Sequence, residues 1–142
     1  MGKLFFEDVE VGTNIPALVK RPTTRQLVKW AGATLDYYEG HYDKDFVQRL
    51  GLPGVIVHGC LKAAFLVQLI TDWVKEEGGI KKLSCSFRGM DPHSIELTCR
   101  GKVTKKYVEG DEHLIECELW IDNANGERTT EGAATIILPS KG

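Results

Sequence analysis

The amino-acid sequence predicts an α+β fold in which an antiparallel sheet wraps around one long central helix. Two observations favour this fold. Residues 58–77 have a helical pattern that is apolar on most sides, and such a helix has to be buried by other elements. One strand-like segment lies in the first part of the chain, and four more follow the helix. Because 142 residues suffice for one hydrophobic core, we expect a single domain across residues 1–142.

The part of the chain that precedes the long helix is expected to contain one strand and two helices. Residues 14–21 have the composition of a first strand. The pair Thr23-Thr24 supplies an N-cap for a helix over residues 24–35, where apolar residues recur at helical spacing. Residues 43–50 form a second, shorter helix, which a turn containing glycine and proline ends.

The long helix is predicted from large apolar residues that recur at every fourth position. These are Leu61, Phe65, Leu69 and Trp73. Other apolar and small residues fill much of the remaining circumference, and the pair Gly78-Gly79 ends the helix. Charged residues interrupt the apolar run before it reaches the roughly 20 residues that cross a bilayer. We therefore expect a buried helix and no membrane span.

The second half of the chain reads as strands joined by tight turns. The strand-like segments are residues 80–90, 94–108, 113–122 and 127–139. In the third segment one face carries Ile115, Cys117, Leu119 and Ile121, and such alternation is typical of a strand. Turn residues at Gly110-Asp111 and at positions 123–126 predict hairpins. We therefore expect these four strands to form an antiparallel meander.

The composition argues against several classes of function. The net charge is −2 and Lys and Arg are not clustered in excess, so we expect no nucleic-acid surface. The N-terminus turns acidic early and lacks a small-residue cleavage site, so we expect no secretory leader. The four cysteines are isolated and each stands in an apolar setting, as reduced thiols do. They are Cys60, Cys85, Cys99 and Cys117. These features predict a cytoplasmic protein.

The residues that point to chemistry lie between Asp36 and Gly59. Asp36 and His41 are five positions apart, which would place them about 140° apart on a helix. Gly40 breaks the helix between them and lets both side chains converge from a loop. A carboxylate and an imidazole that converge can transfer protons. The alternative interpretation of this pair is a capping aspartate and a surface histidine.

This segment resembles the hydratase motif of the MaoC-like, hot-dog-fold (R)-specific enoyl-CoA hydratases and 3-hydroxyacyl-ACP dehydratases. Asp36 matches the acid of that motif, His41 matches its histidine, and Val57-His58-Gly59 matches the V-H-G that opens the central helix. Tyr38 and Glu39 stand where the family usually has Asn-Pro. The spacing of Asp, His and His-Gly is the specific part of the resemblance, which extends over nearly the whole chain.

Two further details refine the resemblance. Leu35 replaces the glycine that usually precedes the acid. The form D-Y-Y-x-x-H, together with T-D-W at residues 71–73, is more similar to a subgroup associated with actinobacterial steroid side-chain degradation. In the related hydratases a serine further along the central helix helps to position the acid. The corresponding positions, Val67 and Gln68, offer no hydroxyl group.

The resemblance implies a lyase that needs no cofactor. Water would add across the α,β double bond of an acyl-CoA or acyl-ACP to give the (R)-3-hydroxyacyl product, and dehydration would be the reverse. Asp36 and His41 would act on the water and on Cα. The Gly59 N–H lies in the first turn of a helix, where it has no intrahelical acceptor and the dipole favours negative charge. It would therefore hold the thioester oxygen.

The resemblance also implies an oligomer, because relatives join two sheets into one and the CoA enters between the subunits. The partner would be an identical chain, in a homodimer or higher oligomer, or a second MaoC-like chain in a heteromer. An edge strand with unpaired backbone groups favours the same expectation.

Five further residues are candidates for substrate binding: Tyr37, Tyr38, Val57, His58 and Arg88. The two tyrosines could line the acyl pocket or wedge between helices. Arg88 could meet a CoA phosphate or be a solvated charge at a strand edge, and His58 by itself fits packing or capping better than catalysis. The four histidines show no H-x-H or H-x-x-x-H spacing, so we expect no metal.

Two other functions remain open from the sequence. A hot-dog thioesterase would share the fold and the helix-start oxyanion site, but it would carry its acid elsewhere, commonly on the central helix. A non-catalytic acyl-binding subunit of a heteromeric hydratase would account for the altered Asn-Pro and the missing serine. The pairing of Asp36 with His41 argues against the thioesterase, whereas the non-catalytic subunit stays open.

Overall fold

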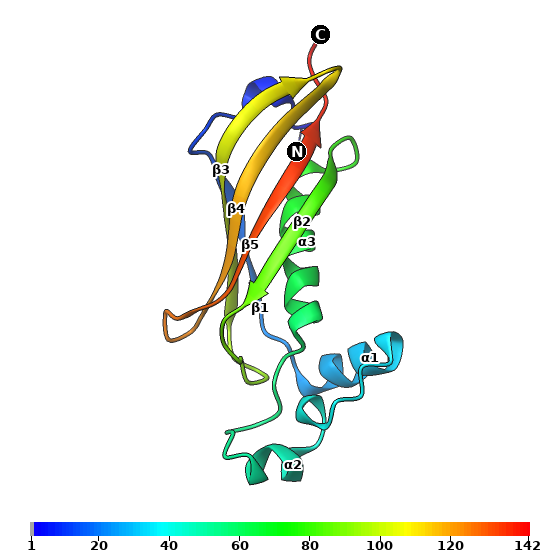
Figure 1. Cartoon of the computed structure of the whole chain (residues 1–142), viewed down its shortest axis with the longest axis vertical. Coiled ribbons are helices and arrows are strands. Elements are labelled where there is room, and N and C mark those ends of the chain that lie inside the picture. Colours follow the sequence, from blue (N-terminus) through cyan, green and yellow to red (C-terminus); the bar gives the residue numbers. More distant parts are fainter. Residues whose placement is uncertain (1) are drawn as a thin grey trace.

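A computed structural model describes residues 2–142 (Figure 1). Its strands are β1 (Asn14–Lys20), β2 (Gly79–Phe87), β3 (Leu97–Glu109), β4 (Glu112–Asn123) and β5 (Arg128–Leu138). Its α-helices are α1 (Thr24–Thr34), α2 (Lys44–Arg49) and α3 (Gly59–Val74), and it has short 3-10 helices η1 (Phe6–Asp8) and η2 (Glu39–His41). The order of elements confirms the predicted α+β fold.

The five strands form one antiparallel sheet in the order β1-β3-β4-β5-β2. β3, β4 and β5 follow one another as predicted, but β2 does not continue that meander. It pairs with β5 and forms an edge, so the prediction of a four-strand meander was wrong for this strand. The apolar alternation of a strand reports which face is buried, and it carries no information about which strand lies alongside.

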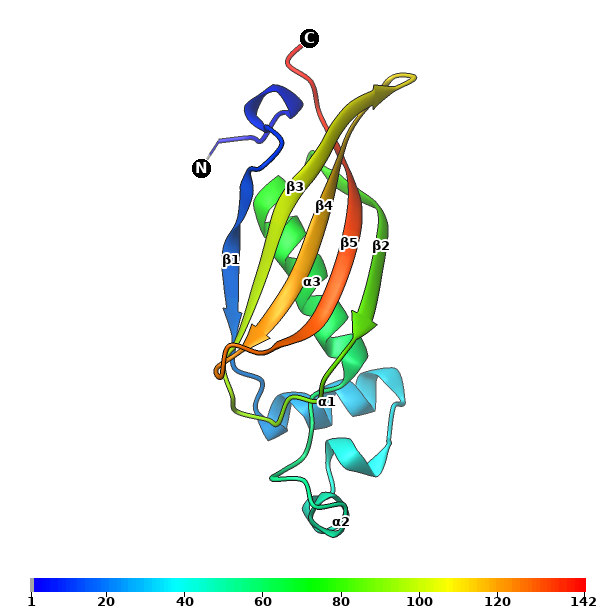
Figure 2. The ribbon, with the colours of Figure 1, turned by 60° about the vertical axis from the view of Figure 1, so that its left-hand side comes forward.

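The sheet curves around α3, which lies along its concave face (Figures 1 and 2). The predicted inner face of β4 is buried, at Ile115, Cys117, Leu119 and Ile121. Leu61, Phe65 and Leu69 of α3 are buried as well, whereas Trp73 is only partly buried. α3 ends at Val74, three residues before the predicted end, because Lys75 adopts a positive φ of 61°. The central helix and the wrapped sheet therefore share one core.

The helices α1 and α2 lie together beyond the N-terminal end of α3 (Figures 1 and 2). The Thr23 hydroxyl accepts a hydrogen bond from the Gln26 N–H, as the sequence predicts for this N-cap. Asp43 caps α2 in the same way, by accepting from the Phe46 N–H at 2.9 Å. Leu35 ends α1 in the left-handed conformation, with φ of 62°, a geometry in which glycine is far less strained. Asp36 follows it immediately.

Two other sequence expectations can be compared with the structure. Gly110 and Gly126 have positive φ at the two predicted hairpin turns. Of the cysteines, Cys99 and Cys117 are buried, but Cys60 is exposed, so the expectation of an apolar setting was wrong there. Within the described part of the chain, no helix has the length and apolar character needed to cross a membrane.

Candidate active site

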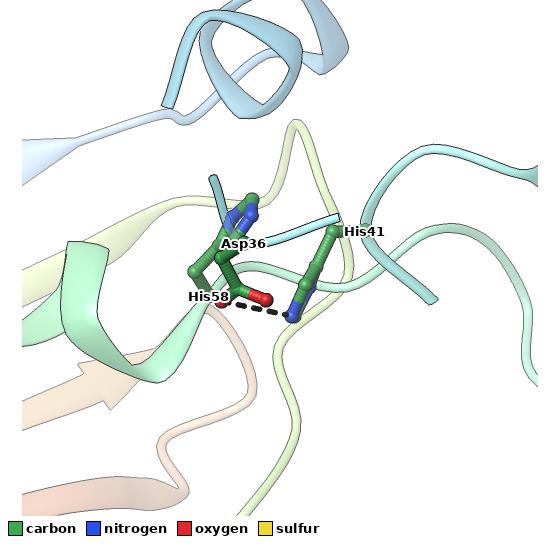
Figure 3. A group of neighbouring side chains, drawn as sticks. All are labelled: Asp36, His41 and His58. Carbon is green, nitrogen blue, oxygen red and sulfur yellow. Dashed lines mark ion pairs between the residues drawn. The ribbon is translucent and has the colours of Figure 1, made fainter. Parts of the chain in front are cut away.

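The structure brings three of the candidate side chains together at the start of α3. Asp36 follows α1, His41 ends η2, and His58 is the N-cap of α3 (Figure 3). Their nearest carboxylate and ring-nitrogen atoms lie within 4.8 Å of one another. Asp36 and His41 converge as predicted, but Gly40 does not break the helix before them. Leu35 ends α1, and Gly40 lies within η2, where a Cβ would collide with the ring of Tyr38.

The hydrogen bond of the His41 ring determines which nitrogen is free. His41 Nδ1 lies 2.8 Å from the backbone oxygen of Ile56, and a carbonyl oxygen can only accept. The neutral ring therefore carries its proton on Nδ1 and presents the Nε2 lone pair toward Asp36. The segment that carries Ile56 is itself held, because the Ile56 N–H donates to the Gly40 oxygen at 2.9 Å. His41 is oriented as a proton acceptor.

Asp36 Oδ2 lies 3.9 Å from His41 Nε2. That separation is too long for a direct hydrogen bond, but a single water oxygen can be within hydrogen-bond distance of both atoms. The His41 side chain is nearly buried, whereas 44% of the Asp36 side chain is exposed. The pair can therefore receive a water and a substrate from the Asp36 side.

His58 is fully buried, and its ring stacks on that of His41 with centroids 3.7 Å apart and planes at 21°. Neither ring nitrogen has a hydrogen-bond partner among residues 2–142. Burial lowers the pKa of His58, and the neighbouring His41 lowers it further. The nearby Asp36 backbone and the charge of its carboxylate raise the pKa by less. The ring is therefore neutral at pH 7. Its burial agrees with a packing role, and the side chain makes no capping hydrogen bond.

Gly59 is the first residue of α3 and follows His58 directly, so its N–H lies beside the cluster. A Cβ at this position would lie 3.0 Å from the ring of Phe87 at the end of β2. The absence of a side chain thus lets β2 approach the N-terminus of the helix closely. The orphan N–H groups of this first turn are suited to stabilising negative charge.

The remaining substrate-binding candidates differ in their surroundings. Tyr38 packs edge-on against His41, with ring centroids 5.4 Å apart. Tyr37 packs instead against Tyr42 and is about half exposed. Val57 is buried. Arg88 is exposed and pairs with Glu131 at 3.5 Å, as a solvated charge at a strand edge would. The structure therefore places Tyr38 and Val57 next to the cluster, and it gives Tyr37 and Arg88 other neighbours.

A buried ion pair near the site was missed by the sequence analysis. Lys62, one turn into α3, is buried and donates to Asp91 Oδ2 at 3.0 Å and to the Gly89 oxygen at 2.9 Å. The Thr129 hydroxyl donates to the same carboxylate oxygen at 2.5 Å. The Val57 N–H donates to the Asp91 backbone oxygen at 2.8 Å, so this pair ties the loop after β2 to the start of α3. The one signal in the sequence was a lysine inside an apolar helical pattern.

Asp36, His41 and His58 are residue types that bind zinc. Stacked imidazole rings direct their in-plane lone pairs side by side rather than onto a common point. The cluster is therefore poorly shaped for a shared metal ion. The spacing of the histidines in the sequence did not show that His41 and His58 lie close together.

Clefts offer limited room beside the cluster. One of about 300 Å³ has His41 in its wall, with Tyr42, Lys44, Gly54 and His93 among its other lining residues. A larger cleft of about 440 Å³ lies near the other end of α3 and is lined by Leu18, Leu69 and Trp73, among others. His41 is thus a nearly buried residue at the wall of a cleft, and Asp36 is the more exposed member of the pair.

Comparison with known proteins gives consistent results. A family described as "MaoC like domain" matches residues 8–118. A protein named (R)-specific enoyl-CoA hydratase from Rhodospirillum rubrum is 25% identical over 138 residues, which are 97% of this chain and 94% of that protein.

Solved structures show the same fold. R-hydratase PhaJ1 from Pseudomonas aeruginosa superposes with a TM-score of 0.89 and 18% identity, covering 98% of this chain and 88% of that one. The ChsH1-ChsH2 complex from Mycobacterium tuberculosis contains a chain with a TM-score of 0.80 and 22% identity, covering 91% of this chain and 98% of that one. These similarities confirm the predicted hot-dog fold.

Proposed function

The chain belongs to the MaoC-like domain family and is a hydratase or dehydratase, and on this basis we propose that it adds water across the α,β double bond of an enoyl-CoA. The product is the (R)-3-hydroxyacyl-CoA, and the reverse dehydration uses the same groups. The observation that carries this proposal is the geometry of Asp36 and His41, in which a free Nε2 faces a carboxylate at 3.9 Å.

In the proposed mechanism one water molecule lies between Asp36 and His41. The Asp36 carboxylate accepts a hydrogen bond from the water and orients it, while His41 Nε2 takes its other proton as the oxygen bonds to Cβ. The electron pair of the double bond moves toward the thioester oxygen, which the Gly59 N–H stabilises. Collapse of the enolate then takes the proton back from His41 to Cα, so no second acid is needed. The hydrogen bond to Ile56 keeps the ring in place throughout.

The experiment is to incubate the purified chain alone with a series of trans-2-enoyl-CoA thioesters and to follow loss of the conjugated thioester. The same acyl groups on ACP test the carrier, and chiral analysis gives the configuration of the product. Release of free CoA without hydration would show that the chain is a thioesterase instead. The chain alone could also catalyse neither reaction and become active after a second MaoC-like chain is added. That result would identify it as a non-catalytic or incomplete subunit.

We further propose that the acyl group is bulky, as in lipid or steroid side-chain metabolism. The D-Y-Y-x-x-H form of the motif supports this. Tyr37 and Tyr38 are each about half exposed and pack against neighbouring aromatic rings, so neither is committed to filling a short acyl pocket. Small side chains, Ala63 and Ala64, follow the start of α3. A kcat/KM higher for crotonyl-CoA than for long-chain or steroid side-chain enoyl-CoAs would contradict this part alone.

The active form is proposed to be an oligomer, either of identical chains or with a second MaoC-like chain. β2 is an edge strand with unpaired backbone groups, which proteins normally cover. Large apolar side chains near the site are exposed, namely Leu35, Tyr37, Phe87 and Met90. The ChsH1-ChsH2 structure is a complex of two named chains. Light scattering of the active protein tests the proposal, and a fully active species of 15.8 kDa would exclude it. A cytoplasmic location stays a prediction.

A further inference from the structure

The buried imidazole of His58 lacks a reason in folding alone. The ring is fully excluded from solvent, and neither nitrogen makes a hydrogen bond of normal geometry among the described residues, although the Asp36 backbone lies close enough to raise the pKa of the ring. Burying unpartnered polar atoms costs free energy, so an apolar side chain would stabilise this position better. The residue also makes no capping hydrogen bond at the start of α3. Within residues 2–142, the aromatic ring in contact with it is that of His41, which stacks on it.

The stack completes the set of contacts that orient the His41 ring. Ile56 accepts a hydrogen bond from Nδ1, and Tyr38 packs edge-on at 5.4 Å. The hydrogen bond fixes the position of Nδ1, and Tyr38 restrains one side of the His41 ring. The face of the His58 ring, 3.7 Å away, restricts rotation of the imidazole about its own side-chain bond. The stack thus adds to the Ile56 hydrogen bond a second restraint, which keeps the free Nε2 directed at Asp36.

We propose that His58 is a positioning residue, whose flat ring holds His41 in the plane that serves proton transfer. The inference rests on the function proposed above, because it concerns the same proton acceptor. In this role His58 acts through the ring of His41, on which it stacks. Since the ring is neutral at pH 7, it adds no positive charge beside His41 when that ring accepts a proton.

The test compares two substitutions of His58 that differ in shape. His58→Leu removes the flat face and retains similar bulk, whereas His58→Phe retains a flat face and removes both nitrogens. Neither removes a capping hydrogen bond. A displacement of a reacting group by about 1 Å can cost on the order of 100-fold in rate. We expect kcat of His58→Leu to fall by about that factor with KM nearly unchanged, and His58→Phe to recover most of it.

The matched control is His113→Leu, the same change in a histidine that packs edge-on against Phe6 far from the site. It should leave kcat unchanged. Melting temperatures of all variants show whether each is folded. A folded His58→Leu with wild-type kcat would overturn the proposal. So would a folded His58→Phe that is as slow as His58→Leu, because the nitrogens rather than the flat face would then matter.

A second measurement needs no substrate. Nitrogen NMR of labelled histidine reports the tautomer and protonation of each imidazole, and the four histidines can be assigned by single substitutions. We expect His41 to be Nδ1-protonated in the wild type and in His58→Phe, and to lose that preference in His58→Leu. If the wild type turned over no enoyl thioester, the proposed function would be wrong. The NMR comparison of the wild type with the two His58 variants would still show whether the His58 ring orients His41. If His58→Leu did not fold, two other results would still overturn the inference. One is a charged His58 ring in the wild type at pH 7. The other is a His41 ring in His58→Phe that no longer carries its proton mainly on Nδ1.

Discussion

Asp36 Oδ2 and His41 Nε2 lie 3.9 Å apart, across the short segment between the end of α1 and the end of η2. This separation leaves room for one water oxygen in contact with both atoms. Because Nδ1 donates its proton to the Ile56 oxygen, the nitrogen that faces the carboxylate in the neutral ring is the one without a proton. The consequences of this arrangement, and of the contacts around it, can be measured.

Removing either member of the pair should abolish most of the activity while leaving the fold intact. General acid–base assistance contributes about 10²–10⁴-fold to a rate, so Asp36→Asn and His41→Gln should each lower kcat by that order. Steady-state kinetics on the best enoyl-CoA checks this. The controls are Asp45→Asn, an exposed aspartate, and His113→Gln. Retention of more than about a tenth of wild-type activity by either site variant would remove that residue from the mechanism.

The buried pair of Lys62 and Asp91 should matter for stability far more than a surface pair. Lys62→Met leaves a buried carboxylate without its cation, which typically costs about 3–5 kcal/mol of unfolding free energy. Urea denaturation measures the loss. Lys81→Met, which breaks an exposed pair with Glu112, should leave the unfolding free energy nearly unchanged. Equal effects of the two substitutions would contradict the assignment of the Lys62 pair as buried.

The unfolding free energy should decrease as the pH is lowered, because of His58. Its pKa is lowered in the folded protein by burial, so below about 6.5 the unfolded chain binds a proton that the folded chain does not. The unfolding free energy therefore decreases as pH falls through that value, until the pKa of the folded state is reached. Denaturation curves at several pH values between 7.5 and 5 test this. His58→Phe should show a smaller decrease, and an identical dependence in both proteins would exclude His58 as its source.

The exposed Cys60 should react with alkylating reagents before the buried Cys99 and Cys117. Burial raises the pKa of the Cys99 and Cys117 thiols to about 12, so both stay protonated and inaccessible in the native protein. Cys60 is exposed. Alkylation at pH 8 followed by peptide mapping should modify Cys60 first and the two buried thiols only after unfolding. Because Cys60 follows Gly59, its modification should also slow turnover, and Cys60→Ser should resist this inhibition. Rapid native labelling of Cys99 would contradict the expectation.

Several features of the protein were determined by local sequence patterns. The four-residue recurrence from Leu61 to Leu69 predicted the central helix, and the alternation from Ile115 to Ile121 predicted the inner face of β4. Both patterns follow from the periodicity of one element, so they need no knowledge of its neighbours. The convergence of Asp36 and His41 was predicted, but the prediction that Gly40 breaks the helix was wrong. Leu35 ends α1 with a positive φ, and Gly40 lies within η2.

Tertiary structure alone decided which distant segments meet. β2 lies beside β5, Lys62 reaches Asp91 twenty-nine residues away, and the ring of His58 stacks on His41. Each of these contacts depends on where loops carry the chain and on how side chains fill a shared core. Periodicity within one element contains no information about either. The spacing of the histidines argued only against a metal motif, whereas packing at the start of α3 brought two of them face to face.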